Sequence, residues 1–384
     1  MADKINIAIE KEKENLHVFL RKSFQSANIN FLIGSGCSDP AIKTLGNVEN
    51  DIQTLLREGK EDEAEKKMCD FLKPFVISAN KLIAGEDESD NQITQNNYKE
   101  FLNNISCILT ERKNNILPKQ ATIFTTNYGL FIEHASDGFR QTIKLNDGFN
   151  RNPTLNNEFR FSVSEFFNSI YNNGNLYNYQ VEIPSINLIK LHGSLSWKRN
   201  EGDIIFSVDY LKKMPQDFPH IFSNDQNGDS NTAEPAPKLI KEINTQIRRF
   251  NDQFSIILPR KDKFQNTLLD RTYYDLLRVY ANELDKENTL LIAEGFSFAD
   301  EHIQDITKRA LRNPTLRLII FCHNESDIGG YEDKFAQYNN VDYVYHEDEA
   351  LDFKKFNEIL KDIIPDEAAK SEAAAEDKGA VDDQ

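Results

Sequence analysis

Short apolar runs and stretches of helical periodicity alternate along most of the chain. The runs are rich in β-branched and aromatic residues and end in glycine or polar residues, which is typical of buried strands. Several segments between them repeat apolar residues every three or four positions and are predicted to be helices. Strands that alternate with helices predict an α/β fold with a Rossmann-like, doubly wound parallel sheet. The predicted strands lie in NINFLI, ATIFT, RQTIKL, INLIKL, GDIIFSV, QFSIILP, TLLIAEGF and TLRLIIFCH.

The predicted sheet is interrupted by a polar helical segment. Residues 47–115 are rich in Glu, Lys, Asn and Gln, have helical spacing and contain no convincing strand. We interpret 47–115 as a helical insertion in a Rossmann-like domain made of residues 1–46 and 116–365. Its acidic stretch GEDESDNQ is predicted to be a solvated loop. The Ala- and Glu-rich end, residues 366–384, is predicted to be a disordered acidic tail.

The segment before the first predicted strand is also expected to be helical. Ile5, Ile7 and Ile9 continue into Leu16 and Phe24 with a spacing that resembles one apolar helix face. This pattern predicts one amphipathic helix that leads into the first strand.

The charge and composition of the chain argue against some classes of protein. The chain has 384 residues and a net charge of −17, of which the last 20 residues supply −5. An acidic surface argues against direct nucleic-acid binding, so backbone amides and helix N-termini would hold an anionic ligand. No apolar run is long enough to cross a membrane and the first residues lack a signal peptide, so we expect a cytoplasmic protein.

Neither cysteines nor histidines are spaced as metal ligands. The four cysteines form no C-x-x-C pair, and the seven histidines show no metal-binding motif. We therefore expect reduced thiols and no metal.

Polar residues follow four of the predicted strands. In an open parallel sheet, ligands bind in the crevice outside the carboxyl ends of the strands, so these residues are site candidates. After the first strand, Gly34 and Gly36 flank Ser35 and can let a phosphate approach the backbone. The third glycine of G-x-G-x-x-G is replaced by Asp39, and a tight structural turn explains the pattern about equally well.

The other strand ends carry Thr126 and Asn127, then His192, then Gly295 with Ser297. An asparagine amide can hold ribose hydroxyls or a water molecule, although asparagine is also a common helix N-cap. A histidine at a strand end can act as a general base, or it can be purely structural. The glycine and serine of the last strand end fit a nucleotide-contacting loop or a capped turn.

Taken together and in this order, LIGSGCS, FTTNYG, LIKLHGSLSW and LLIAEGFSFADEHI resemble the sirtuin superfamily. The similarity is strongest to prokaryotic sirtuin-like NAD hydrolases of antiphage defence, and the helical insertion resembles the subunit that works beside a HerA-type hexameric ATPase. The resemblance implies that Asn127 and His192 are the catalytic pair. It also implies that NAD contacts Gly34, Ser35, Gly36, Cys37, Ser38, Thr126, Gly193, Ser194, Gly295 and Ser297.

Two departures from this family shape the expected function. The chain lacks the two C-x-x-C pairs of the zinc module found in protein deacylases, which disfavours acyl-lysine removal. Gly129 stands where the family's T-x-N-x-D pattern has an acidic residue near the nicotinamide end of NAD.

The resemblance implies an NAD hydrolase that yields nicotinamide and ADP-ribose and depletes NAD in antiphage defence. It also implies a homo-oligomer with a HerA-type ATPase as partner. Two alternatives stay open: a non-enzymatic subunit that senses NAD or ADP-ribose, with Gly129 marking the loss of turnover, and an ADP-ribosyltransferase or deacylase.

Overall fold

An eight-stranded parallel sheet forms the centre of the protein. The computed structural model describes residues 3–43, 48–86, 89–113, 116–139, 143–152, 158–173, 180–200, 202–222, 237–257 and 271–365. The strand order is β1-β12-β11-β10-β2-β3-β7-β4, and every adjacent pair is parallel. The predicted α/β architecture is therefore confirmed. The strands are β1 (Asp3–Asn6), β2 (Asn28–Ile33), β3 (Gln120–Thr125), β4 (Lys144–Asn146), β7 (Ser185–Lys190), β10 (Thr289–Glu294), β11 (Leu316–Phe321) and β12 (Val341–Tyr345).

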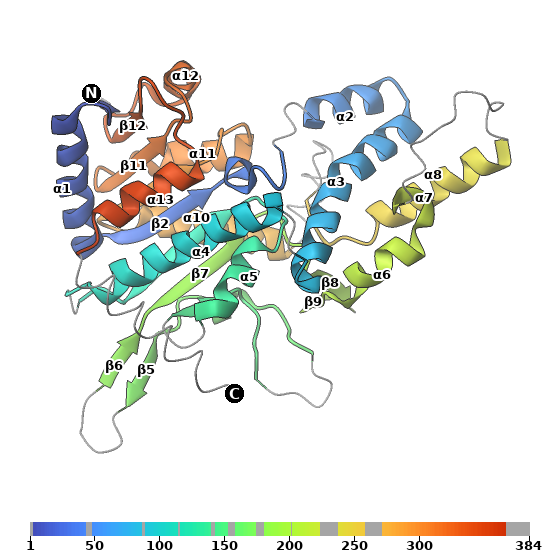
Figure 1. Ribbon diagram of the computed structural model, residues 1–384, viewed down its shortest axis with the longest axis horizontal. Helices are drawn as coiled ribbons and strands as arrows, with labels where there is room; N and C mark the ends of the chain where they lie inside the picture. The colour runs from blue at the N-terminus through green and yellow to red at the C-terminus, as the bar shows by residue number, and fades with distance from the viewer. Residues whose placement is uncertain are drawn as a thin grey trace.

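Helices cover both faces of this sheet (Figure 1). On β2, Phe31 and Ile33 pack into the core on one face and Leu32 into the core on the other, as expected for a strand buried on both sides. The sheet is thus doubly wound, as predicted. The first face carries α1 (Glu10–Ser26), α4 (Ser89–Thr110), α5 (Phe131–Ser136) and α13 (Phe353–Asp362), and the second carries α10 (Arg271–Asp285), α11 (Glu301–Ala310) and α12 (Ile328–Phe335).

Three helices lie in the predicted insertion, and they pack in two ways. α4 runs along the sheet and contacts α5, α13 and β3, whereas α2 and α3 gather beside the sheet with α6, α7 and α8 (Figure 1). Asn251 of α8 donates from Nδ2 to the carbonyl oxygen of Glu65 on α3 (2.9 Å). The domain division stays a prediction. The bounds are α2 (Val48–Arg57), α3 (Glu61–Ala84), α6 (Asp209–Asp217), α7 (Pro219–Phe222) and α8 (Pro237–Asn251).

Short hairpins and 3₁₀ turns lie outside the eight-stranded sheet. Two antiparallel hairpins pair β5 with β6 and β8 with β9. Among the described residues, no helix is both long and apolar enough to cross a bilayer. The remaining bounds are β5 (Ile170–Asn173), β6 (Gln180–Ile183), β8 (Trp197–Asn200) and β9 (Asp203–Phe206), with short 3₁₀ turns η1 (Ser35–Ser38), η2 (Asp137–Phe139), η3 (Val163–Glu165) and η4 (Glu325–Asp327).

The structure corrects several predicted elements. The first helix begins only at Glu10, because Ile5 lies in β1, whose partner β12 at the sheet edge was not predicted. GDIIFSV contributes β9 to a hairpin and not to the main sheet. Within the described part of QFSIILP, the pairing is one isolated bridge between Gly193 and Ile256.

The prediction that GEDESDNQ forms a solvated loop is also partly wrong. Ser89 and the residues that follow it belong to α4, which extends to Thr110. The predictions for 366–384 and for residues 140–142 of RQTIKL lie outside the described residues.

The winding of the sheet reverses between β2 and β10, and their two glycine loops touch at that point. From β2, the strands β3, β7 and β4 extend to one side, whereas β10, β11 and β12 extend to the other. A Cβ atom added to Gly34 would lie 2.1 Å from the backbone oxygen of Gly295. Gly295 itself has a φ of +60°, which favours glycine. Only glycine at position 34 permits this approach.

We expect Gly34→Ala to destabilise the fold by about 1–3 kcal/mol, because the added methyl group overpacks against backbone that cannot rotate away. Gly330→Ala is the matched control. It lies in α12 with open space around its Cβ position and should stabilise by up to about 1 kcal/mol. Urea unfolding measures both changes, and equal effects of the two substitutions would contradict the prediction.

Candidate functional site

The sheet brings the four predicted strand ends together at one edge. β10, β2, β3 and β7 are consecutive neighbours and all parallel, so their carboxyl ends meet on the same side of the sheet. This edge includes the reversal between β2 and β10, which is the place where open α/β sheets bind ligands. All the predicted site residues therefore lie around one edge, although their side chains differ in where they point.

Asn127 is fixed between two strand ends. Its backbone N–H donates to Thr125 Oγ1 (3.0 Å), and Thr125 Oγ1 donates to the carbonyl oxygen of Ile33 on β2 (2.7 Å). Its side-chain Nδ2 donates to the carbonyl oxygen of Gly34 (2.8 Å). The N-cap of α5 is Leu130, so the alternative role of Asn127 as a helix cap is wrong.

Tyr98 of α4 reaches the same place and was not predicted from the sequence. Its hydroxyl lies 3.2 Å from Ser38 Oγ and 3.4 Å from Asn127 Nδ2. Its ring stacks on Phe131 at 5.6 Å with an interplanar angle of 10°. Burial, with smaller contributions from nearby acidic groups, raises the pKa of Tyr98 far above its usual value, so the phenol stays protonated.

A small cavity lies between these residues and β7. Its volume is about 10 Å³, which is about the space for one water molecule. A ligand with an aromatic ring can therefore enter only when a lining side chain moves. The lining residues are Ser38, Tyr98, Thr125, Asn127, Gly129, Phe131, Ile132 and Lys190.

His192 pairs with a carboxylate that comes from the opposite helical layer. Its Nε2 lies 2.9 Å from Oδ2 of Asp300, and both side chains are mostly buried. Asp300 is also the N-cap of α11, with Oδ1 accepting from the backbone N–H groups of His302 and Ile303. Burial alone would raise the pKa of Asp300, but the hydrogen bond and charge of His192 outweigh it and lower the pKa to about 2.

Asp300 is a candidate site residue that was not predicted from the sequence. An aspartate directly before the helical pattern EHIQDI is an N-cap signal, but nothing in the sequence connects it to His192.

Several predicted cofactor contacts point into the protein. Cys37 is fully buried, its Sγ donates to the carbonyl oxygen of Glu294 (3.4 Å), and burial raises its pKa well above the usual value. Ser194 is also fully buried. Gly193 has a φ of +83° and approaches the backbone of Ser255.

Ser35 and Ser297 are exposed, and Thr126 is half-buried. The hydroxyl of Ser297 accepts from the backbone N–H of Ala299 (3.3 Å), as in a capped turn. Gly36 packs against Gly295, because a Cβ there would lie 2.9 Å from the Cα of Gly295.

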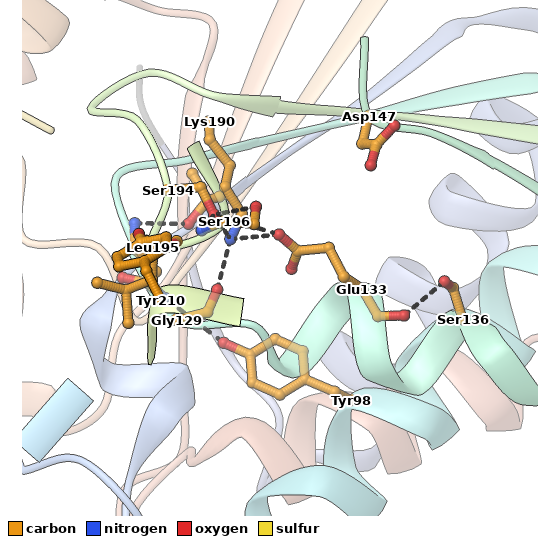
Figure 2. Close-up of polar contacts among 12 residues, drawn as sticks. Tyr98, Gly129, Glu133, Ser136, Asp147, Lys190, Ser194, Leu195, Ser196 and Tyr210 are labelled. Carbon is orange, nitrogen blue, oxygen red and sulfur yellow. Dashed lines mark hydrogen bonds and ion pairs between the residues drawn. The ribbon is translucent and has the colours of Figure 1, made fainter. Parts of the chain in front are cut away.

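A buried ion pair involves Lys190, one of the residues that line the cavity (Figure 2). Lys190, whose side chain is 4% exposed, lies 2.7 Å from Glu133 Oε1. Its ammonium also donates to the carbonyl oxygen of Gly129 and to Ser194 Oγ (3.2 Å). Neither Lys190 nor Glu133 was predicted as a site residue.

A comparison with protein-family models identifies the domain. The SIR2-like domain matches residues 121–344, which is more than half of the chain. The chain belongs to the SIR2-like domain family. The match begins in β3 and ends in β12, so this SIR2-like domain includes Asn127, His192 and Asp300, while the Gly34 loop precedes the matched region. No curated protein shows a significant match to the chain.

Family membership confirms the predicted resemblance at the level of a sirtuin-like domain. SIR2-like domains use NAD as a substrate, so membership supports an NAD-dependent activity in general. The glycine loops lie at the reversal of the sheet, where open α/β sheets bind ligands. The positions of their missing Cβ atoms are filled by the backbone of the opposing loop, so these glycines serve the contact between the loops. Within the described ranges, no group of three or more His, Cys, Asp or Glu side chains could hold a metal ion.

We expect Asp300→Asn in this SIR2-like domain to lower stability in a pH-dependent way. Asparagine keeps the helix cap but removes the charge. The pKa of Asp300 is about 2 in the fold and about 4 in an unfolded chain, so the ionised form stabilises the fold above pH 4 and this contribution disappears as the pH falls toward 2. Urea unfolding should show a difference of about 2 kcal/mol at pH 5 that shrinks toward pH 3. A pH-independent difference would contradict this.

We expect Tyr98→Phe and Ser38→Ala to be coupled in a double-mutant cycle. The two hydroxyls share one buried hydrogen bond, so the coupling in unfolding free energy should be about 0.5–1.5 kcal/mol. Tyr280→Phe with Ser38→Ala is the control pair, because the Tyr280 hydroxyl bonds Thr307 on the other face of the sheet. That pair should show no coupling, and no coupling in the first pair would refute the contact.

Proposed function

We propose that this SIR2-like protein hydrolyses NAD at the bond between nicotinamide and ribose, giving nicotinamide and ADP-ribose. The observation that carries the proposal is the pair of fixed polar groups at the sheet reversal. Asn127 is held by Gly34 and Tyr98 on one side, and His192 is held by Asp300 on the other. Glycosidic cleavage needs such groups to position the ribose and activate water.

The contact with Asp300 supports a different role for each nitrogen of His192 in this proposal. With Nε2 donating to the aspartate, the other nitrogen, Nδ1, carries the lone pair that can take a proton. A carboxylate that orients a histidine in this way stabilises the protonated ring that forms. Nicotinamide leaves as a neutral molecule, so the site needs a base but no general acid. In this proposal His192 is the base and Asn127 positions the ribose or the attacking water.

We further propose that the activity serves antiphage defence by depleting NAD in the cytoplasm, and that a partner opens the site. The small size of the cavity beside Asn127 supports control of this kind, since a nicotinamide ring does not fit without movement. We propose a homo-oligomer and a HerA-type hexameric ATPase as the assembly. Exposed apolar side chains on the projecting β5–β6 hairpin support association; they are Ile170, Tyr171 and Val181 (Figure 1).

The test is release of nicotinamide and ADP-ribose from NAD, measured by chromatography with and without the ATPase. Asn127→Ala and His192→Ala should each lower the rate by about 10² to 10⁴-fold, the usual contribution of a positioned base or orienting group. His220→Ala is the control, because His220 is exposed and distant in sequence from the predicted strand ends. It should keep the full rate.

NAD binding without release under either condition would overturn the hydrolase proposal and favour a sensing subunit. Full activity in His192→Ala would remove that residue from the mechanism.

A further inference from the structure

Tyr98 fills the space beside Asn127 in the candidate site. Its side chain is 1% exposed and lines the same cavity of about 10 Å³ as Asn127. Figure 2 shows its ring extending from α4 toward Gly129, which also lines the cavity. The remaining space is about that of one water molecule, so the ring of Tyr98 takes up room that a ligand ring would need.

The hydroxyl of Tyr98 also uses the hydrogen-bonding capacity of this site. Asn127 Nδ2 carries two N–H groups. It donates to the carbonyl oxygen of Gly34 (2.8 Å), and it lies 3.4 Å from both the Tyr98 hydroxyl and Ser38 Oγ. These two hydroxyl oxygens are themselves 3.2 Å apart. The amide donors of Asn127 are therefore directed to protein atoms, and a ligand reaches them only by displacing Tyr98.

Tyr98 can leave its place without disrupting the central sheet. Two other residues of the cavity wall, Thr125 and Lys190, lie in β3 and β7, inside the sheet. Tyr98 comes from α4 instead, and its ring lies between those of Phe131 (5.6 Å between centroids) and Phe353 (5.0 Å). Both neighbouring rings belong to helices, α5 and α13. A shift of α4, or a rotation of the side chain, therefore frees the volume of one six-membered ring.

We infer that Tyr98 is an autoinhibitory side chain, which takes the place of the ligand beside Asn127 and has to move before NAD enters. This inference rests on the proposed function, because NAD is the ligand. The apparent affinity of the protein for NAD is then reduced by the fraction of molecules in which Tyr98 is displaced. The contacts of the tyrosine with Asn127, Ser38 and Phe131 set that fraction.

A purely supporting role of Tyr98 predicts the opposite effect of its removal. If the hydroxyl only held Asn127 in position, its loss would weaken ligand binding. Asn127 keeps two other contacts, from its backbone N–H to Thr125 Oγ1 and from its amide to the carbonyl oxygen of Gly34. The loss of Tyr98 therefore leaves Asn127 in place, and a gain in affinity identifies autoinhibition.

The experiment measures binding to the full-length protein without a partner, by calorimetry. The probe is carba-NAD, in which a carbocycle replaces the nicotinamide-bearing ribose, so that it cannot be hydrolysed at that bond. Tyr98→Ala should raise the affinity by about 10- to 100-fold, because the hydrogen bonds and the ring contact no longer favour the closed state. Tyr98→Phe keeps the ring and loses the hydroxyl, and it should raise the affinity by about two- to tenfold.

Phe101→Ala is the matched control. Phe101 is a fully buried aromatic residue of the same helix, and it is not among the residues that line the cavity. Its replacement loosens the packing of α4 without vacating the site, so the affinity should change by less than about twofold. Thermal unfolding of each variant establishes that it is folded. Where Tyr98→Ala does not fold, Tyr98→Phe decides.

An unchanged or lower affinity in the folded Tyr98 variants overturns the inference, and so does an equal gain in Phe101→Ala. Release of nicotinamide from NAD separates this inference from the hydrolase proposal. Faster release by Tyr98→Ala than by wild type, without a partner, supports both. Tighter binding of carba-NAD with no release by any variant, with or without the ATPase, supports autoinhibition and overturns the hydrolase proposal.

Discussion

The close contact between the two glycine loops at the reversal of the sheet is the constraint on which the site depends. Gly34 and Gly295 directly follow β2 and β10, and their backbones approach so closely that neither position has room for a side chain. The hydrogen-bonded ladder sets the spacing of β2 and β10, and the glycine contact lets the loops that follow them pack together at the carboxyl edge. Asn127 then reaches back to the carbonyl oxygen of Gly34, so the position of its amide follows directly from the glycine contact.

The two central polar groups are held by opposite layers of helices. Asn127 is tied through Tyr98 to α4 on one face, and His192 is tied through Asp300 to α11 on the other. Movement of either layer relative to the sheet would change the distance between them. The control by a partner proposed above can therefore act through α4, because Tyr98 belongs to that helix and lines the cavity.

The sequence predicted the positions at which polar groups meet, but not the side chains that hold them. Parallel strands end at one edge, so glycine and polar residues after four apolar runs were sufficient to locate Gly34, Asn127, His192 and Gly295. Tyr98 and Asp300 act through contacts between segments far apart in the chain, and no local pattern encodes such a contact. The residues of strand β1 were predicted to be part of a helix because of their position in the chain. Ile5, Ile7 and Ile9 alternate as in a strand, but they directly precede a true helix whose apolar spacing they extend.

Gly129 raises the question of why this chain lacks a side chain beside Asn127. A Cβ at position 129 would meet only ordinary contacts, 3.6 Å from Phe131 and 3.9 Å from Ile42, and the residue has no positive φ. Neither space nor backbone geometry therefore requires glycine. Its carbonyl oxygen instead accepts from Lys190, which also holds Glu133 four residues further along the chain. Glu133 places a negative charge beside Lys190, and the ammonium of Lys190 balances it. A second carboxylate at position 129 would face the same single ammonium, and it would add an unbalanced buried charge, which is unfavourable in such a site.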